Sequence, residues 1–253
     1  MPLSGLKRIG LLALLAATAV GGTAAAALVE VDNVVLRADG GFQPQTLPRN
    51  SYAPIEFHGR IDISGRNGRP VPPLKQALIS FDRDGRLSVA GLPVCSPDSI
   101  AQASTAQART TCRGAIVGDG EVGARIAVPG GSVAARSKLT VFNGPRLAGL
   151  PTAVLHARLT APVTETYAIV VPIQQRGGGF RYRARLDLPP IAGGAGAITH
   201  VDVEIGRRYR AGGRERSYAS ARCSDNILET HGRFTFEDGT IIDGLVEKFC
   251  RSK

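Results

Sequence analysis

The amino-acid sequence predicts an all-β protein, an antiparallel β-sandwich, on three observations. Several segments alternate apolar and polar residues with a period of two, which places successive side chains on opposite faces of a strand. Asp-Gly and Asn-Gly dipeptides separate several of these segments, as turns do between strands. No long segment has the 3.6-residue period of an amphipathic helix. Two smaller packed β-units are the alternative arrangement.

Three segments show the alternation most clearly, residues 55–63, 180–187 and 200–205. In the second of them, Phe180 and Tyr182 fall on one predicted face and Arg181 and Arg183 on the other. Strands with one apolar and one polar face suit an antiparallel sheet that is solvated on one side.

Two Asp-Gly dipeptides predict hairpins. Asp84-Gly85 lies between the β-like residues 79–81 and 87–89, and Asp238-Gly239 lies between residues 234–236 and 240–242. Asp-Gly tolerates the positive φ angles of a type I′ turn, whose twist matches that of the strands it joins.

A single short helical segment is predicted near residues 97–104. Ser96 is a suitable N-cap, Pro97 fits the first helical turn, and the charge of Asp98 complements the helix dipole. A bridge between Cys95 and Cys112 would tie this segment against the strand that follows it.

The N-terminus predicts export. Lys7 and Arg8 precede an uncharged run rich in Leu and Ala, and Ala25-x-Ala27 fits the small-residue cleavage rule. We expect residues 1–27 to be a cleaved signal peptide and residues 28–253 to be a disulfide-stapled β-domain, either single or split into two subunits near 145–152. The expected location is secreted, either extracellular or periplasmic. The alternative is an uncleaved membrane anchor over residues 9–29.

Four cysteines, at positions 95, 112, 223 and 250, allow three disulfide connectivities. The spacing favours Cys95–Cys112 and Cys223–Cys250, since each pair brackets a compact local unit. A four-thiolate zinc site is disfavoured because the sequence has no C-x₂₋₄-C knuckle. We therefore predict two disulfides, which persist in an oxidising compartment.

The charge pattern supplies one candidate binding face. The chain has a net charge of +10, and nine arginines against four acids lie between Arg181 and Arg222. Alternating arginines along a strand line one face as a ladder, and guanidinium groups suit phosphates and carboxylates. A charged outer sheet face in an arginine-rich chain is the competing interpretation. The candidate ligand-binding residues are Arg181, Arg183, Arg185, Arg207, Arg208 and Arg210.

Several segments together resemble uncharacterised secreted, β-rich proteins of GC-rich bacteria, over about residue 50 to the end of the chain. These segments are residues 91–95, 112–118, 141–144, 216–223 and 232–240, with the final Cys250. The resemblance implies export and both cysteine pairs, and it implies no activity.

The sequence contains no recognised catalytic motif. It has no Gly-x-Ser-x-Gly elbow, no His-Glu-x-x-His helix and no P-loop, so we predict no catalytic residue, no metal and no cofactor. The expected function is a non-catalytic structural or binding protein that contacts an anionic envelope component. Nucleic acid is a less favoured partner, because Tyr182 falls opposite the arginine ladder. The alternative is an extracellular hydrolase of an envelope polymer, which would need two carboxylates facing one cleft.

Overall fold

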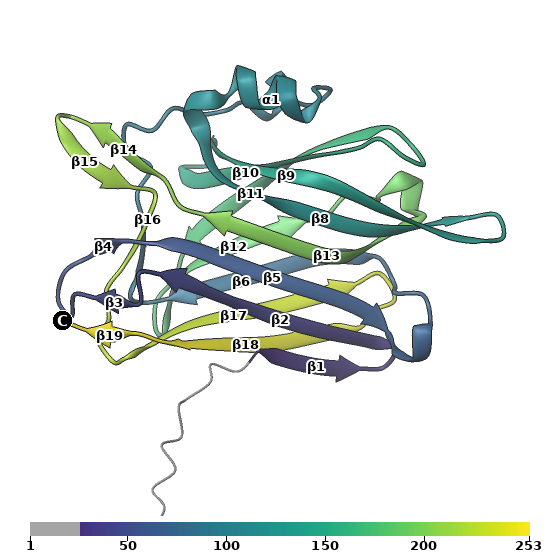
Figure 1. Ribbon diagram of the computed structural model, residues 1–253, viewed down its shortest axis with the longest axis horizontal. Coiled ribbons are helices and arrows are strands. Elements are labelled where there is room, and N and C mark those ends of the chain that lie inside the picture. The colour runs from purple at the N-terminus through teal and green to yellow at the C-terminus, as the bar shows by residue number, and fades with distance from the viewer. Residues whose placement is uncertain (1–25) are drawn as a thin grey trace, which may run out of the picture.

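The structure is a computed structural model that describes residues 26–253 (Figure 1). Residues 1–25 of the predicted signal peptide, and with them most of the alternative anchor, lie outside the described residues. Twelve strands form one sheet in which every neighbouring pair is antiparallel. The prediction of an all-β, antiparallel fold is confirmed. No helix within residues 26–253 has the length and apolarity needed to cross a membrane.

The strands of the large sheet are, in spatial order, β1 (Ala27–Val31), β2 (Val34–Gln43), β5 (Glu56–Gly65), β13 (Gly196–Ile205), β8 (Ile116–Val128), β9 (Gly131–Leu147), β10 (Leu150–Leu159), β11 (Glu165–Gln175), β12 (Phe180–Asp187), β6 (Leu74–Asp82), β17 (Ile227–Phe236) and β18 (Ile241–Phe249). Smaller sheets join β4 (Ala53–Pro54), β16 (Ala219–Ala221) and β7 (Gly85–Leu87), then β14 (Arg208–Ala211) with β15 (Arg214–Ser217), and β19 (Arg251–Ser252) with β3 (Thr46–Leu47). The helix α1 (Thr105–Thr111) and four 3₁₀ turns complete the fold, the turns being Arg66–Gly68, Pro97–Ser99, Arg113–Ala115 and Ala192–Gly194.

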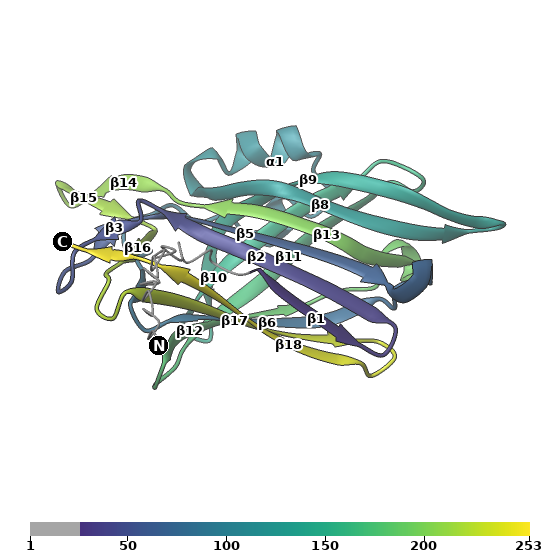
Figure 2. The same ribbon diagram turned by 60° about the horizontal axis from the view of Figure 1, so that its bottom comes forward.

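The large sheet curls until its two halves face each other and its edge strands β1 and β18 lie side by side (Figure 2). Val29 of β1 packs against the same core cluster as Ile242 of β18. The backbone ladders stop at this seam, because β1 pairs with β2 and β18 pairs with β17. The result is a sandwich-like core enclosed by a single continuous sheet.

The apolar faces predicted from the alternation fill this core. Leu36 and Ile63 of one half pack with Phe234 and Phe236 of the other half. A second cluster joins Val141 of β9 with buried residues of four further strands, β8, β10, β11 and β12, and with Leu92 and Tyr218 from connecting segments. Burying these side chains stabilises the fold at about 25 cal/mol per Å² of apolar surface, so core packing, rather than any single polar contact, holds the halves together.

One of the two predicted hairpins is confirmed. β17 and β18 pair with each other, and Gly239 between them has a φ of 89°. The prediction for Asp84-Gly85 was wrong, because β6 pairs with β12 and β17, whereas β7 pairs with β16. The chain turns out of the large sheet at Asp84, whose buried carboxylate binds Arg222 instead of closing a local turn.

The helical prediction needs a correction of its bounds. Within the predicted segment near 97–104, residues Pro97–Ser99 form only a 3₁₀ turn, and the α-helix runs from Thr105 to Thr111. The reason is local: Ser96 makes no side-chain cap, whereas Ser104 forms a reciprocal capping box with Gln107.

Both predicted disulfides are present. The Cys95–Cys112 bridge joins Cα atoms 5.4 Å apart and anchors the loop that carries α1, and the Cys223–Cys250 bridge joins Cα atoms 6.0 Å apart near the C-terminus. Residues 145–152, where the sequence placed a possible boundary, form the turn between β9 and β10, which pair within the large sheet.

The loop that carries α1 docks on the sheet through His156 of β10. This imidazole is fully buried, its Nε2 lies 3.2 Å from the carbonyl oxygen of Ala103, and its Nδ1 has no hydrogen-bond partner within residues 26–253. Desolvation lowers the pKa of His156 below its ordinary value of 6.5, and the nearby Arg158 acts in the same direction. The folded state therefore favours the neutral ring.

This burial predicts an acid-sensitive contribution to stability. Because the folded pKa is lowered, the contribution is complete above pH 6.5 and is lost as the pH falls through the folded pKa. Thermal unfolding measured between pH 7.5 and pH 5 should show wild-type stability falling more steeply than that of His156→Gln. Parallel slopes for the two proteins would contradict this prediction, whatever their absolute stabilities.

Candidate anion-binding site

The candidate site lies at one end of the molecule, where short strands leave the large sheet. The hairpin β14–β15 and the sheet β4–β16–β7 gather there, at the left of Figure 1. The hairpin is tied down by Tyr209, whose hydroxyl donates to the carbonyl oxygens of Ser88 and Ala90. Three separate stretches of the chain therefore meet in a small region.

Three guanidinium groups converge on one tyrosine ring. Arg86, Arg181 and Arg222 place their Cζ atoms 5.4, 5.5 and 5.6 Å from the centroid of Tyr52. Arg181 also donates a hydrogen bond of 2.7 Å from Nη1 to the Tyr52 hydroxyl. We call these four residues the Tyr52 cluster. Contacts of this kind contribute about 0.5–2 kcal/mol each, depending on how far the cation is desolvated.

A β-bulge aims Arg181 at Tyr52. The pairing of β12 with β6 shifts its register between Phe180 and Tyr182, so Arg181 is the extra residue of the bulge. The same shift corrects the predicted strand face: Tyr182 packs on the core, while Phe180 packs against the His231 ring, 6.0 Å away. The alternation of strand faces along β12 is therefore interrupted at Arg181, the residue that contacts Tyr52.

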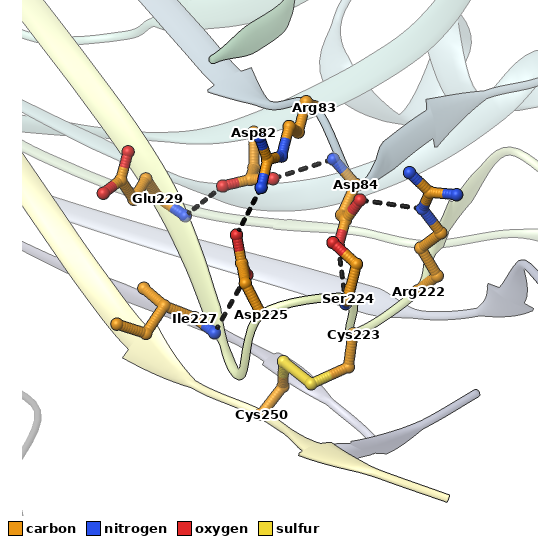
Figure 3. A network of polar contacts seen from close by, with 10 residues as sticks. All are labelled: Asp82, Arg83, Asp84, Arg222, Cys223, Ser224, Asp225, Ile227, Glu229 and Cys250. Atoms are coloured by element: carbon orange, nitrogen blue, oxygen red, sulfur yellow. Dashed lines mark hydrogen bonds and ion pairs between the residues drawn. A yellow bond between two sulfur atoms is a disulfide. The ribbon is translucent and has the colours of Figure 1, made fainter. Parts of the chain in front are cut away.

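Arg222 is held in place by a buried carboxylate (Figure 3). Its Nε donates to Oδ1 of Asp84 at 2.7 Å, and the Ser224 amide donates to Oδ2 of the same carboxylate at 2.7 Å. Burial alone raises the pKa of Asp84, but the hydrogen bonds from Ser224 and Arg222 outweigh it and hold that pKa below 3.8. Asp84 is fully buried and Arg222 is about one-third exposed. The ion pair therefore holds Arg222 in position within the Tyr52 cluster.

The segment after Arg222 is fixed by further polar contacts. Asp82 accepts hydrogen bonds from the amides of Asp84 and Glu229, and Arg83 pairs with Asp225 at 2.7 Å. Burial raises the pKa of Asp82, and the same effect raises the pKa of Glu229. The disulfide of Cys223 lies beside this network, so the backbone that carries Arg222 is restrained on both sides.

Two hollows that share part of their lining lie in this region, and one of them is lined by Tyr52 and Arg86 of the cluster. The first, of about 200 Å³, is called the Glu56 hollow, and the second, of about 250 Å³, is called the Tyr52 hollow. They share Pro54, Arg208 and Ser217. The Glu56 hollow is also lined by Gln43, Pro44, Ile55, Glu56, Gly206 and Arg207. The Tyr52 hollow is also lined by Tyr52, Arg86, Ser88, Glu215, Arg216 and Ser220.

Positive charge around the Tyr52 hollow is incompletely balanced. Arg86, Arg208 and Arg216 are exposed, and none of them forms an ion pair with a carboxylate in the part of the chain that the structure describes. The one carboxylate in the lining, Glu215, lies 3.8 Å from Arg210. Guanidinium groups held together in this way favour the binding of an anion.

The candidate arginines from the sequence fall into two groups. Arg181 belongs to the Tyr52 cluster and Arg208 lines both hollows, whereas Arg207 lines the Glu56 hollow alone and its guanidinium donates to the carbonyl oxygens of Arg113 and Ile116. The other three line neither hollow: Arg183 donates to Ser80, Arg185 pairs with Asp187, and Arg210 lies near Glu215.

Sequence reasoning missed Tyr52 and Arg86. Neither residue stands in a motif, and Tyr52 is 129 positions from Arg181, its hydrogen-bond partner. Their meeting depends on the pairing of β7 and β4 with β16, which no local pattern predicts.

The two hollows hold few carboxylates. Each hollow is lined by one carboxylate, Glu56 or Glu215, and neither contains the facing pair that glycoside hydrolysis needs. Within residues 26–253, no three His, Cys, Asp or Glu side chains are placed to hold a metal ion. No family model matches the chain, and no curated protein and no solved structure matches it either.

Proposed function

We propose that the protein is a secreted, non-catalytic binding protein of the cell envelope or its exterior, which holds an anionic group at the Tyr52 cluster and the adjoining Tyr52 hollow. The observation that carries this proposal is the convergence of three guanidinium groups on Tyr52. Of these three arginines, Arg86 lines the Tyr52 hollow, and Arg208 and Arg216 line it too.

Electrostatic repulsion among the arginines is the physical reason to expect a bound anion. Like charges held close together repel, and in this cluster only Asp84, bound to Arg222, offsets the repulsion directly. A phosphate or carboxylate in the hollow would accept charge-assisted hydrogen bonds from guanidinium groups, each contributing about 1.5–3 kcal/mol. The arginines are held by Tyr52, Asp84 and a β-bulge before any ligand arrives, so little side-chain freedom is lost on binding.

Two features support the location. The two disulfides are stable in an oxidising compartment, and the N-terminal sequence has the pattern of an export signal. Outside the cytoplasm the abundant anions are envelope polymers. An anionic envelope component is therefore the proposed partner.

The proposal predicts that removing two unpaired arginines weakens anion binding. The double variant Arg86→Ser/Arg208→Ser should bind inorganic polyphosphate about tenfold or more weakly than the wild type, with a shallower dependence on salt. Isothermal titration calorimetry at two salt concentrations measures both quantities. Both residues are exposed, so the fold should persist, and circular dichroism checks that it does.

The matched control removes two arginines elsewhere. Arg69 and Arg125 are also exposed and line neither hollow, so Arg69→Ser/Arg125→Ser makes the same change in net charge. This variant should keep polyphosphate affinity within about twofold of the wild type. Equal weakening in the two double variants would attribute binding to net charge and overturn the proposed site.

A further inference from the structure

We infer that the ligand is an acidic polysaccharide, a chain of sugar units carrying carboxylates, which lies across both hollows. This inference rests on the proposed function and names the class of anion that the site takes. Three observations carry it: the continuity of the two hollows, the chemistry of their linings, and the engagement of the Tyr52 ring.

The two hollows lie next to each other. Pro54, Arg208 and Ser217 belong to both linings, so the hollows adjoin along a shared wall. Arg208 is exposed and has no carboxylate partner within residues 26–253, and it stands where the two hollows meet. A ligand with repeated anionic units can place one unit on each side of this arginine.

Each hollow also carries a carboxylate. Glu56 lines the Glu56 hollow and packs against Gly206. A Cβ atom added at Gly206 would lie 2.6 Å from the Glu56 Cγ, so no larger residue fits there without a shift of Glu56. Glu215 lines the second hollow together with Ser88 and Ser220. Carboxylates repel a purely anionic chain such as polyphosphate, but they accept hydrogen bonds from hydroxyl groups. A ligand that supplies both carboxylates and hydroxyls satisfies the whole lining.

The aromatic content disfavours nucleic acid. Among residues 26–253, Tyr52 is the only aromatic residue that lines either hollow, and its ring is already in contact with three guanidinium groups. Bases bind single-strand sites by stacking on free aromatic faces. The sugar chain is accordingly held by charge and hydroxyl contacts, without ring stacking.

The deciding experiment compares two probes whose affinities should change in opposite directions when the two carboxylates are removed. The double variant Glu56→Gln/Glu215→Gln makes the protein more positive, so a site for simple polyanions should bind inorganic polyphosphate more tightly. An oligogalacturonate of several units should instead bind about fivefold or more weakly, because the acceptors for its hydroxyl groups are weakened. Calorimetric titration of wild type and variant with both probes gives the comparison.

The control is Glu30→Gln/Glu237→Gln, which changes the net charge equally at exposed positions outside both hollows. It should shift both affinities by less than about twofold. If oligogalacturonate also binds the Glu56/Glu215 variant more tightly, the polysaccharide inference is overturned while the anion site stands. If the wild type binds neither probe, the proposed function itself fails.

Chain length provides an independent readout. A trimer of galacturonate spans both hollows and should bind the wild type about tenfold or more tightly than the monomer, because its second unit binds at high effective concentration. Arg208→Ser removes the cation shared by the two hollows and should reduce this gain more than Arg86→Ser does. Equal binding of monomer and trimer would contradict the path across both hollows.

Discussion

Replacing Asp84 with alanine is expected to lower the free energy of unfolding by about 3 kcal/mol, because it removes one partner of a buried ion pair. The Asp84 side chain is fully buried and accepts hydrogen bonds from Arg222 and from the Ser224 amide. The alanine variant leaves both donors without this acceptor. Urea unfolding followed by circular dichroism measures the loss.

Asp225→Ala is the matched control. Asp225 belongs to the same network, but its pair with Arg83 is about half exposed on both sides, so its removal should lower the free energy of unfolding by about 1 kcal/mol or less. A comparable loss in the two variants would show that the buried pair does not anchor the network.

The Asp84 variant should also alter the acid response. Because the pKa of Asp84 in the folded protein lies below 3.8, its contribution is present above that pH and is lost as the pH falls through the lowered value. Wild-type stability should therefore decline more steeply below about pH 4 than that of Asp84→Ala. The two curves are expected to approach each other in strong acid.

Removal of the Cys223–Cys250 disulfide is expected to have the other large effect. Its cysteines are 27 positions apart, and closing a loop of that length stabilises the folded state by about 3–4 kcal/mol on the chain-entropy argument. The double variant Cys223→Ser/Cys250→Ser should unfold at correspondingly lower urea concentration. Polyphosphate affinity should fall with it, because Arg222 precedes Cys223 directly and would lose part of its restraint.

The second disulfide supplies the comparison. Cys95 and Cys112 are 17 positions apart, so Cys95→Ser/Cys112→Ser should lose about 3 kcal/mol of stability on the same argument. This bridge holds the loop of α1 and contacts neither hollow, so polyphosphate affinity should remain unchanged. If both variants lose polyphosphate affinity at a temperature where both are folded, the prediction that the Cys223–Cys250 bridge specifically supports the site is contradicted.

The features that could be predicted from the sequence are those that depend on short-range patterns. Alternation identified the core faces of β5 and β13, and the spacing of the cysteines identified both bridges. The Asp238-Gly239 dipeptide predicted the β17–β18 turn correctly, because an Asp-Gly turn depends only on its two flanking strands.

The failures occurred where a distant partner competed with the local pattern. Asp84 stands before a glycine as a turn residue does, but Arg222, 138 positions away, takes its carboxylate. Arg181 follows the alternation of its strand until the bulge re-aims it at Tyr52. A single sequence contains no signal for such long-range pairings, so the ladder predicted along β12 gave no indication that Arg181 joins the Tyr52 cluster while Arg183 and Arg185 lie outside both hollows.

The seam between β1 and β18 has a consequence for where the molecule can change shape. Strands in the interior of the large sheet are held by ladders on both sides, and β12, which carries Arg181, lies between β11 and β6. Between β1 and β18 the large sheet can widen without breaking a ladder of its own, as far as the end where β19 pairs with β3, whereas a similar movement beside β12 would break one. Within the described part of the large sheet, the joint that has no ladder is therefore that of β1 with β18, and the strand that carries Arg181 lies away from it, with a ladder on each side.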